Sequence, residues 1–110
     1  MAREYVLAGA AEGLLMKASG IAEGKGVTFD IGRRPIAATR VAGELIVLEN
    51  VCKHEGCETE WSAKEQGWEC PCHGSLYAAD GTVVRGPSEA DLDRLDYHLD
   101  GDEIVLDQGR

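Results

Sequence analysis

All four cysteines and two of the three histidines of this 110-residue chain fall between positions 52 and 73. They occupy two short segments, CKHEGC at positions 52–57 and CPCHGS at positions 70–75. Buried thiols that serve only packing would not be expected to gather in this way or to interleave with histidine. The clustering therefore predicts a metal centre built from two loops.

The number of donors indicates which centre the loops could hold. One zinc ion takes four donors, so zinc would leave two of the six cysteines and histidines unexplained. A 2Fe-2S cluster has two irons, and each iron needs two protein donors beyond the bridging sulfides, so one cysteine and one histidine from each loop would complete the set. The count favours a 2Fe-2S cluster, with a zinc-stabilised interaction module as an alternative.

The two loops resemble the signature of the Rieske iron-sulfur family. The resemblance lies in a C-x-H motif formed by Cys52 and His54 and a C-x-x-H motif formed by Cys70 and His73. It implies one 2Fe-2S cluster of Rieske type. Cys52 and Cys70 would then hold the inner iron, and His54 and His73 the outer iron.

The second cysteine of each loop makes the chain similar to the Rieske subgroup of cytochrome bc and related quinol-oxidising complexes. In that subgroup these cysteines form a disulfide, which implies a bond between Cys57 and Cys72 here. Closing a loop of about 15 residues is worth roughly 3 kcal/mol in the chain-entropy model. Stable disulfides are uncommon in a reducing cytosol, so this expectation conflicts with the lack of a recognisable export signal.

The resemblance continues beyond the ligands. It implies that the Ser75 hydroxyl donates to a bridging sulfide and that the Tyr77 hydroxyl donates to a ligating cysteine sulfur. Gly86 and Pro87 are similar to the family's proline loop, which covers the third side of the cluster. The specific motifs extend from Leu48 to Ser88.

The donor set also predicts the redox behaviour. Two thiolates and two neutral imidazoles leave the oxidised centre neutral, whereas four thiolates would make it a dianion. An electron is therefore added more easily to the mixed centre than to the all-thiolate one. Such mixed centres lie at roughly −150 to +300 mV, against about −400 mV for plant-type ones. Hydrogen bonds to sulfur raise the potential, so we expect the upper half of that range. His54 and His73 would each keep a second ring nitrogen, which predicts proton-coupled reduction at alkaline pH.

The rest of the chain predicts a small antiparallel all-β domain of the Rieske type, a sandwich or barrel with a cluster-binding subdomain formed by loops at about 50–60 and 68–88. A single domain is expected over residues 1–110. Fourteen glycines suit short strands joined by tight turns. The only helix expected is a short one at 88–94. The strands are expected at 5–8, 27–31, 36–41, Glu44–Glu49, 75–78, 82–84, 95–100 and Glu103–Leu106, with Leu95, Tyr97 and Leu99 on one apolar face.

The charge and the hydropathy pattern narrow the partners and the location. A net charge of −9 repels phosphate backbones and anionic lipid, so nucleic acid and membrane surfaces are poor partners. The apolar stretch at 6–16 is shorter than the roughly 20 residues of a membrane span. We expect a soluble cytoplasmic monomer, or a periplasmic or membrane-associated protein if a leader or anchor has been removed from the chain. Its partners would be redox proteins with basic or neutral docking faces.

No combination of residues supplies a substrate pocket, a nucleophile or an open metal position, so an electron carrier is expected and not an enzyme. Lys53, Glu55 and Glu58 would give the first loop a charged tip, which suits a quinol pocket poorly. The primary expectation is a soluble, high-potential Rieske-type ferredoxin. One alternative is the iron-sulfur subunit of a quinol-oxidising or other respiratory complex. Another is a low-potential ferredoxin of a ring-hydroxylating dioxygenase, a group that lacks the two extra cysteines.

Two tryptophans, Trp61 and Trp68, are expected to serve packing.

Overall fold

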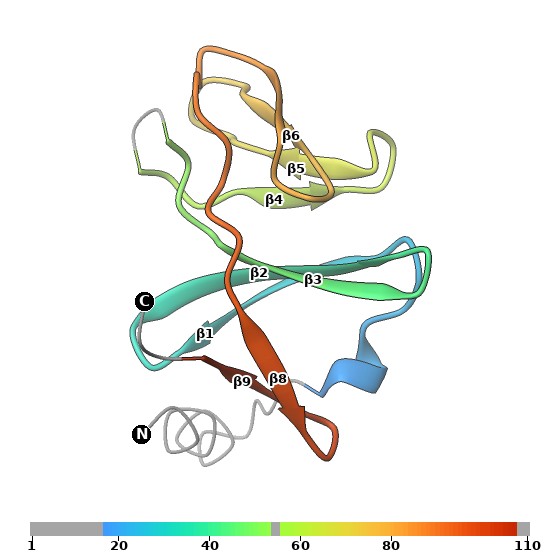
Figure 1. Cartoon of the computed structure of the whole chain (residues 1–110). Helices are drawn as coiled ribbons and strands as arrows, with labels where there is room; N and C mark the ends of the chain where they lie inside the picture. The colour runs from blue at the N-terminus through green and yellow to red at the C-terminus, as the bar shows by residue number, and fades with distance from the viewer. Residues whose placement is uncertain (1–16, 54–55, 108–110) are drawn as a thin grey trace.

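The computed structural model describes residues 17–53 and 56–107. These residues form antiparallel sheets with one 3-10 turn, η1 (Ala18–Gly20), so the all-β prediction is confirmed. Three tiers are stacked in Figure 1. The middle tier, which we call the base sheet, contains β1 (Gly26–Ile31), β2 (Arg34–Val41) and β3 (Glu44–Glu49). The lower tier is the hairpin of β8 (Tyr97–Asp100) and β9 (Glu103–Leu106). The upper tier is the sheet of β4 (Glu60–Ser62), β5 (Gly67–Glu69), β6 (Leu76–Ala78) and β7 (Val83–Arg85).

A two-residue turn, Ala42 and Gly43, joins β2 to β3. Ala42 and Gly43 have φ angles of 52° and 83°, and positive φ at both central positions is typical of the type I′ turns that match strand twist. The carboxylate of Glu23 accepts hydrogen bonds from both backbone N–H groups of this turn. That contact offsets the cost of a left-handed conformation at a residue other than glycine.

The base sheet is buried on both faces, because alternate residues of β2 and β3 enter two different cores. Ile36, Leu45 and Val47 belong to a core that packs the base sheet on β8 and β9. Ile46 and Leu48 point to the opposite face and join a second core under the upper tier. That second core also contains the two cysteines and the tyrosine of the cluster motifs, Cys52, Cys70 and Tyr77.

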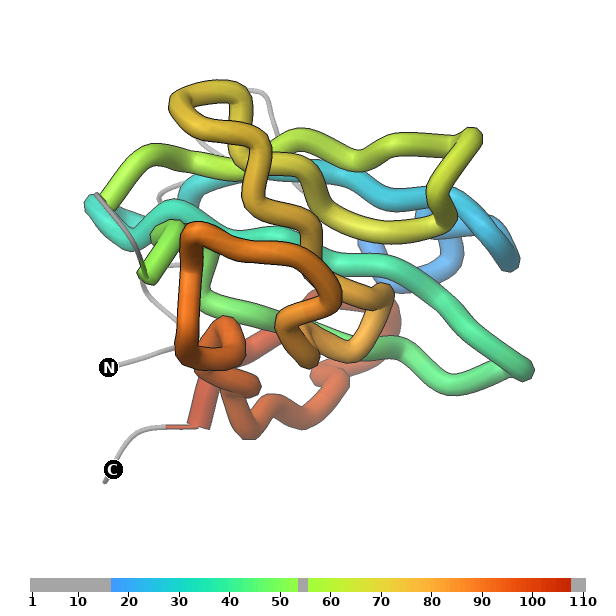
Figure 2. Tube along the Cα trace, turned by 90° about the horizontal axis from the view of Figure 1, so that it is seen from above, coloured from blue at the N-terminus to red at the C-terminus, as the bar shows by residue number. Residues whose placement is uncertain are grey.

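The upper tier, which we call the cluster subdomain, rests on the base sheet when seen from above (Figure 2). Trp61 and Trp68 pack edge to face with centroids 4.9 Å apart, and Trp68 is fully buried. A Cβ atom at Gly26 in β1 would lie 2.4 Å from Cδ2 of Trp61, so only glycine allows this approach of β1 to β4. Both tryptophans therefore serve packing, as predicted.

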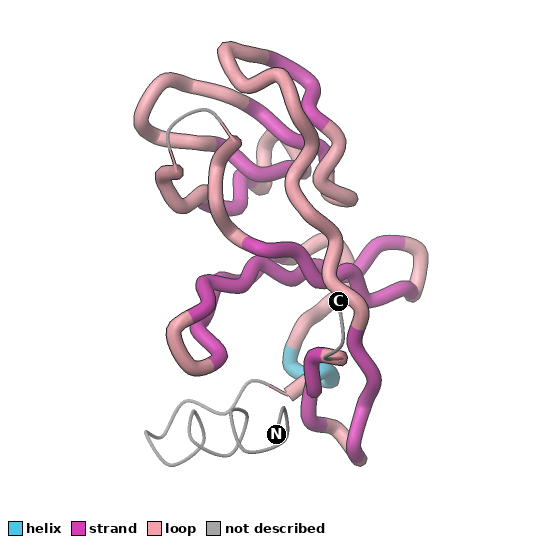
Figure 3. Tube along the Cα trace, turned by 60° about the vertical axis from the view of Figure 1, so that its left-hand side comes forward, coloured by secondary structure: helices cyan, strands magenta, loops and turns pink. Residues whose placement is uncertain are grey.

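The segment that follows β7 connects the cluster subdomain to β8, and it is not helical. The predicted helix at 88–94 is therefore wrong. Its backbone bonds to other parts of the chain: Leu92 N–H donates to the Gly81 carbonyl, and the Asp93 carbonyl accepts from Glu49 N–H. Tertiary partners took the backbone groups that a helix would have paired internally. Figure 3 shows that loops make up much of the cluster subdomain, whereas strands make up the base.

Most other strand predictions hold within one or two residues. The strands at Glu44–Glu49 and Glu103–Leu106 match as predicted, while β4 and β5 were missed. The strand expected at 5–8 lies outside the described residues. Of the three residues predicted to form an apolar face, Leu95 and Tyr97 pack against the core, whereas Leu99 is 46% exposed. In the described parts of the chain, no helix has the length and apolar character needed to cross a membrane.

Candidate metal centre

The two loops have the same backbone hydrogen bonds, although their sequences differ. Cys52 N–H donates to the Cys57 carbonyl at 2.7 Å, and Cys70 N–H donates to the Ser75 carbonyl at 2.8 Å. In each loop a glycine with positive φ, Gly56 or Gly74, donates its N–H to the carbonyl of the first cysteine. Only glycine takes this conformation without cost, so the same turn is used twice to present the first cysteine of each loop.

The first cysteines of the two loops are deeply buried thiols. Cys52 and Cys70 are 1% and 2% exposed, and neither is in a disulfide. Burial raises the pKa of the Cys70 thiol, and its hydrogen bond with Cys52 raises the pKa further. Two interacting thiols in an apolar core are poorly placed to ionise alone, whereas metal cations stabilise the thiolates that would bind them.

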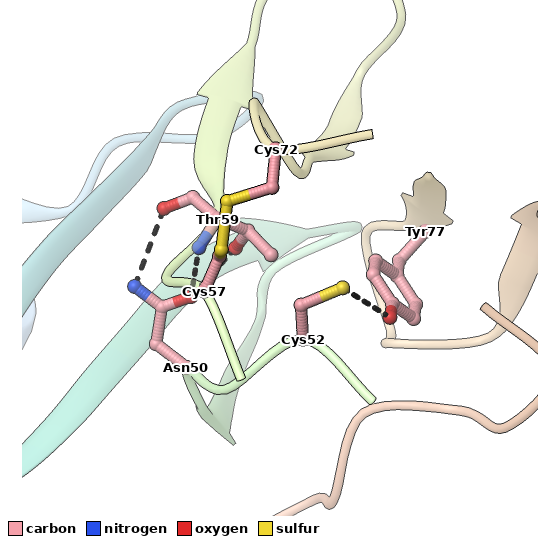
Figure 4. The surroundings of a disulfide bond; sticks show 6 residues. All are labelled: Asn50, Cys52, Cys57, Thr59, Cys72 and Tyr77. Carbon is pink, nitrogen blue, oxygen red and sulfur yellow. Dashed lines mark hydrogen bonds between the residues drawn. A yellow bond between two sulfur atoms is a disulfide. The ribbon is translucent and has the colours of Figure 1, made fainter. Parts of the chain in front are cut away.

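The second cysteines form the disulfide that the family resemblance implied. Cys57 and Cys72 are bonded across the two loops, 15 residues apart in sequence and with Cα atoms 6.6 Å apart (Figure 4). The sulfur atoms of this disulfide and of Cys70 lie within 4.8 Å of one another. Because the disulfide removes two of the four cysteines from the possible ligands, Cys52 and Cys70 remain as the thiol donors.

Tyr77 reaches the first loop from β6. Its hydroxyl oxygen lies 3.2 Å from the sulfur of Cys52 (Figure 4). The same oxygen accepts a hydrogen bond from the backbone N–H of Lys53 at 3.1 Å. Burial and the contact with Cys52 raise the pKa of the Tyr77 hydroxyl, which keeps it protonated. A protonated hydroxyl beside a buried sulfur can act as a hydrogen-bond donor to that sulfur.

Ser75 is fully buried at the end of the second loop. Its hydroxyl oxygen accepts the backbone N–H of Ser88 at 2.9 Å. Because this contact uses an oxygen lone pair, the Ser75 proton stays available for another acceptor. Gly86 and Pro87, the residues expected to form the proline loop, precede Ser88 and are exposed.

The two histidines differ in what the structure describes. His73 is exposed at the tip of the second loop, so a group bound there would lie near the surface. His54 lies outside the described residues. The third histidine, His98, is exposed on β8, and its Nδ1 lies 2.6 Å from Asp107 Oδ1.

A pair of buried polar side chains, Asn50 and Thr59, closes the base of the first loop, and no motif in the sequence predicted it. Oδ1 of Asn50 accepts the N–H of Thr59 at 2.8 Å and its hydroxyl at 2.6 Å, and Nδ2 of Asn50 donates to the Thr59 carbonyl at 3.3 Å. Figure 4 shows this pair beside the disulfide. Asn50 and Thr59 flank the CKHEGC segment, so the only sequence signal was their position.

Charged side chains surround the two loops. Nζ of Lys53 pairs with Asp93 at 2.8 Å, which ties the first loop to the segment after β7. Nε of Arg85 donates to the Gly74 carbonyl at 3.2 Å, and the same side chain lies 3.8 Å from Glu69. The rim of the site is therefore polar and ionic where the side chains are described.

The donor set fits a 2Fe-2S cluster. Two cysteine thiols come from two loops that share their backbone hydrogen bonds, a histidine follows the second of them in the sequence, and a hydroxyl faces one of the sulfurs. Soft thiolates and imidazoles are the ligands of Rieske centres. The one group of at least three closely spaced potential metal ligands among the described residues contains the two disulfide cysteines, so Cys70 is the only member of that group with a thiol to offer a metal.

Comparison with known proteins agrees with this chemistry. The Rieske [2Fe-2S] domain model matches residues 12–96. The Rieske 2Fe-2S iron-sulfur protein YhfW of Bacillus subtilis is 45% identical over 74 residues, which are 67% of this chain and 14% of that protein. The cytochrome b6-f complex iron-sulfur subunit of Synechococcus sp. is 47% identical over 57 residues, which are 52% of this chain and 33% of the subunit. The chain thus spans a third or less of these two relatives.

Solved structures share the fold. A plasma membrane Rieske protein from Synechocystis superposes with a TM-score of 0.66 at 26% identity, covering 76% of this chain and 86% of that one. A hyperthermophilic respiratory Complex III gives a TM-score of 0.69 at 26% identity, covering 82% and 71%. The ferredoxin of carbazole 1,9a-dioxygenase from Nocardioides aromaticivorans gives 0.64 at 20% identity, covering 83% and 91%, which shows likeness of fold alone.

Proposed function

This chain belongs to the Rieske [2Fe-2S] domain family, whose domains carry electrons and are not themselves enzymes, and we propose that it is a high-potential one-electron carrier. The ligands in this proposal are Cys52 and Cys70 on one iron and His54 and His73 on the other. The bound cluster supplies the one-electron oxidation and reduction. We also propose that the chain is a single domain, because the base sheet contributes to both cores.

The protein's own residues would set the environment of that cluster. Cys52 and Cys70 lie in the apolar core, where water is excluded. His73 lies at the surface, which suits an exit route for the electron because electron-transfer partners make small contacts at exposed sites. The Cys57–Cys72 disulfide and the Asn50–Thr59 pair hold the loops in place.

The single observation that carries the high potential is the Tyr77 hydroxyl 3.2 Å from the Cys52 sulfur. A hydrogen bond to a ligating sulfur stabilises the extra negative charge of the reduced state more than it stabilises the oxidised state. The buried Ser75 hydroxyl, which keeps its proton available, is proposed to act in the same way on a bridging sulfide. Both contacts therefore favour reduction.

A redox titration of the purified protein at neutral pH, followed by visible absorption and electron paramagnetic resonance, tests the proposal. We expect a Rieske-type spectrum and a clearly positive potential, in the upper half of the roughly −150 to +300 mV range. A Rieske spectrum with a negative potential would refute the high-potential carrier and would favour a ferredoxin of the dioxygenase type. A colourless protein without iron would refute the cluster.

A second candidate is the iron-sulfur subunit or domain of a quinol-oxidising complex, and the relatives favour it. The matched residues in Synechococcus and in Chlorobaculum thiosulfatiphilum belong to cytochrome b6-f complex iron-sulfur subunits. The exposed ion pair of Lys53 and Asp93 beside the first loop argues for a charge-guided protein partner instead. Co-purification with membranes and reduction by a quinol would favour the subunit, whereas reduction only by a protein donor would favour the free carrier.

A further inference from the structure

Ser88 contacts two side chains that the proposed function assigns to the cluster. Its backbone N–H donates to the Ser75 hydroxyl at 2.9 Å, and its own hydroxyl oxygen lies 2.5 Å from the hydroxyl oxygen of Tyr77. Ser88 is 4% exposed, so water does not compete freely for these bonds. One residue of the segment after β7 thus touches the hydroxyl of each side chain expected to serve the sulfurs.

The hydroxyl of Tyr77 has one proton and three neighbours. The N–H of Lys53 is a donor only, so it uses an oxygen lone pair. When Cys52 is a ligating thiolate, its sulfur has no proton and can only accept a hydrogen bond. The remaining neighbour, the hydroxyl of Ser88, can donate or accept. The direction of the bond between Ser88 and Tyr77 therefore decides whether the tyrosine proton is available to the sulfur.

Ser88 has a choice of two acceptors, and the distances favour one of them. Its hydroxyl oxygen lies 2.5 Å from that of Tyr77 and 3.4 Å from the Ala90 carbonyl. Hydrogen bonds between oxygens are strongest near 2.7 Å and weak at 3.4 Å. The contact between Ser88 and Tyr77 is kept whichever hydroxyl donates. If Tyr77 donates to Ser88 and Ser88 donates to Ala90, one proton lies in a weak bond of 3.4 Å and the Cys52 sulfur receives none. If Ser88 donates to Tyr77, the Tyr77 proton is available to the sulfur at 3.2 Å, which is the stronger arrangement when the sulfur is a thiolate.

We propose that Ser88 is a positioning residue that donates its hydroxyl proton to Tyr77 and so directs the Tyr77 proton to the Cys52 sulfur. The inference rests on the proposed assignment of Cys52 as a cluster ligand. Hydrogen bonds in series polarise one another, so the bond from Ser88 strengthens the bond from Tyr77 to the sulfur. Ser88 acts on the reduced state through Tyr77 and does not touch the sulfur itself.

The test is a double-mutant cycle on the reduction potential of the cluster-loaded protein. The variants are Ser88→Ala, Tyr77→Phe and the double variant. We expect Ser88→Ala to lower the potential by less than Tyr77→Phe does, corresponding to a less than tenfold change in the redox equilibrium, or under about 59 mV for one electron. In the Tyr77→Phe background, Ser88→Ala should cause no further change.

Three controls separate this role from a structural one. Ser88→Thr keeps the hydroxyl and should have the potential of the wild-type protein. Ser62→Ala removes a hydroxyl that binds Glu65 N–H far from the site, and it should leave the potential unchanged. Ser88→Ala keeps the backbone N–H bond to Ser75 and should retain the cluster; if it does not fold, Ser88→Cys, a weak donor, replaces it in the cycle.

The outcomes distinguish this inference from the proposed function. An unchanged or raised potential in Ser88→Ala, or equal shifts with and without the Tyr77 hydroxyl, would overturn the positioning role while the carrier proposal stands. A wild-type protein without a Rieske spectrum would overturn both. A lower potential that requires Tyr77, with unchanged visible absorption per iron, supports the inference.

Discussion

Replacing Asn50 with alanine should destabilise the first loop, because it removes three hydrogen bonds and leaves Thr59 with unsatisfied groups. Asn50 and Thr59 are 1% and 2% exposed, so water cannot replace the lost partner without rearrangement. A typical intramolecular hydrogen bond contributes about 1 kcal/mol net, and a buried group left unpaired costs roughly 1 to 3 kcal/mol. The bond at 3.3 Å is long and counts little. We expect a loss of about 2 to 4 kcal/mol.

Thermal unfolding of the cluster-loaded protein, recorded at one scan rate by circular dichroism, measures this loss. An unfolding entropy of roughly 2.1 cal/mol/K per residue gives about 230 cal/mol/K for 110 residues. A loss of 1 kcal/mol then lowers Tm by about 4 °C, so Asn50→Ala should lower Tm by about 9 to 17 °C. Visible absorption recorded in the same scan should show cluster loss at the same lower temperature.

Two variants calibrate the reasoning. Thr59→Val removes only the hydroxyl and keeps both backbone groups bonded to Asn50, so we expect about 1 kcal/mol, or roughly 4 °C. Ser62→Ala removes an exposed hydroxyl with one local bond and should leave Tm nearly unchanged. A decrease below about 4 °C for Asn50→Ala, or equal decreases for Asn50→Ala and Thr59→Val, would refute the buried pair as the closure of this loop.

Three further changes test other parts of the structure. Gly26→Ala should lower Tm markedly because its Cβ would meet the ring of Trp61 at 2.4 Å, whereas Gly20→Ala, with nothing within 4 Å, should be tolerated; similar Tm values would contradict the close approach of β1 and β4. Replacing both disulfide cysteines with serine should cost about 3 kcal/mol for the 15-residue loop and speed release of iron, and equal release rates measured with a chelator would argue against that role. Hydrogen bonds from η1 lower the pKa of Asp102, so its contribution to stability is present above about pH 4 and is lost as the pH falls through the lowered value. Asp102→Asn should therefore show a smaller decrease of Tm on acidification, and an unchanged acid profile would count against this bond.

Much of the fold was readable from local pattern. The strands of the base sheet are long, rich in β-branched and apolar residues and bounded by turn residues, so the pattern and the structure agree. The strands β4 and β5 were missed because the four residues that connect them, AKEQ, contain no glycine, proline, asparagine or aspartate to mark a hairpin turn. The helix predicted at 88–94 failed because its backbone groups bond to Glu49 and Gly81, which lie far away in the sequence.

The chemistry of the site was determined by the sequence alone, because the number and type of donors within 22 positions decide which metal centres are possible. The family signature also predicted the disulfide between Cys57 and Cys72. The role of Asn50 and the contact of Ser88 with Tyr77 could be seen only in the tertiary structure. Such hydrogen bonds form only when the fold brings segments from different parts of the chain within reach and buries their polar groups. A local sequence pattern specifies neither the distance between those segments nor the burial of their side chains.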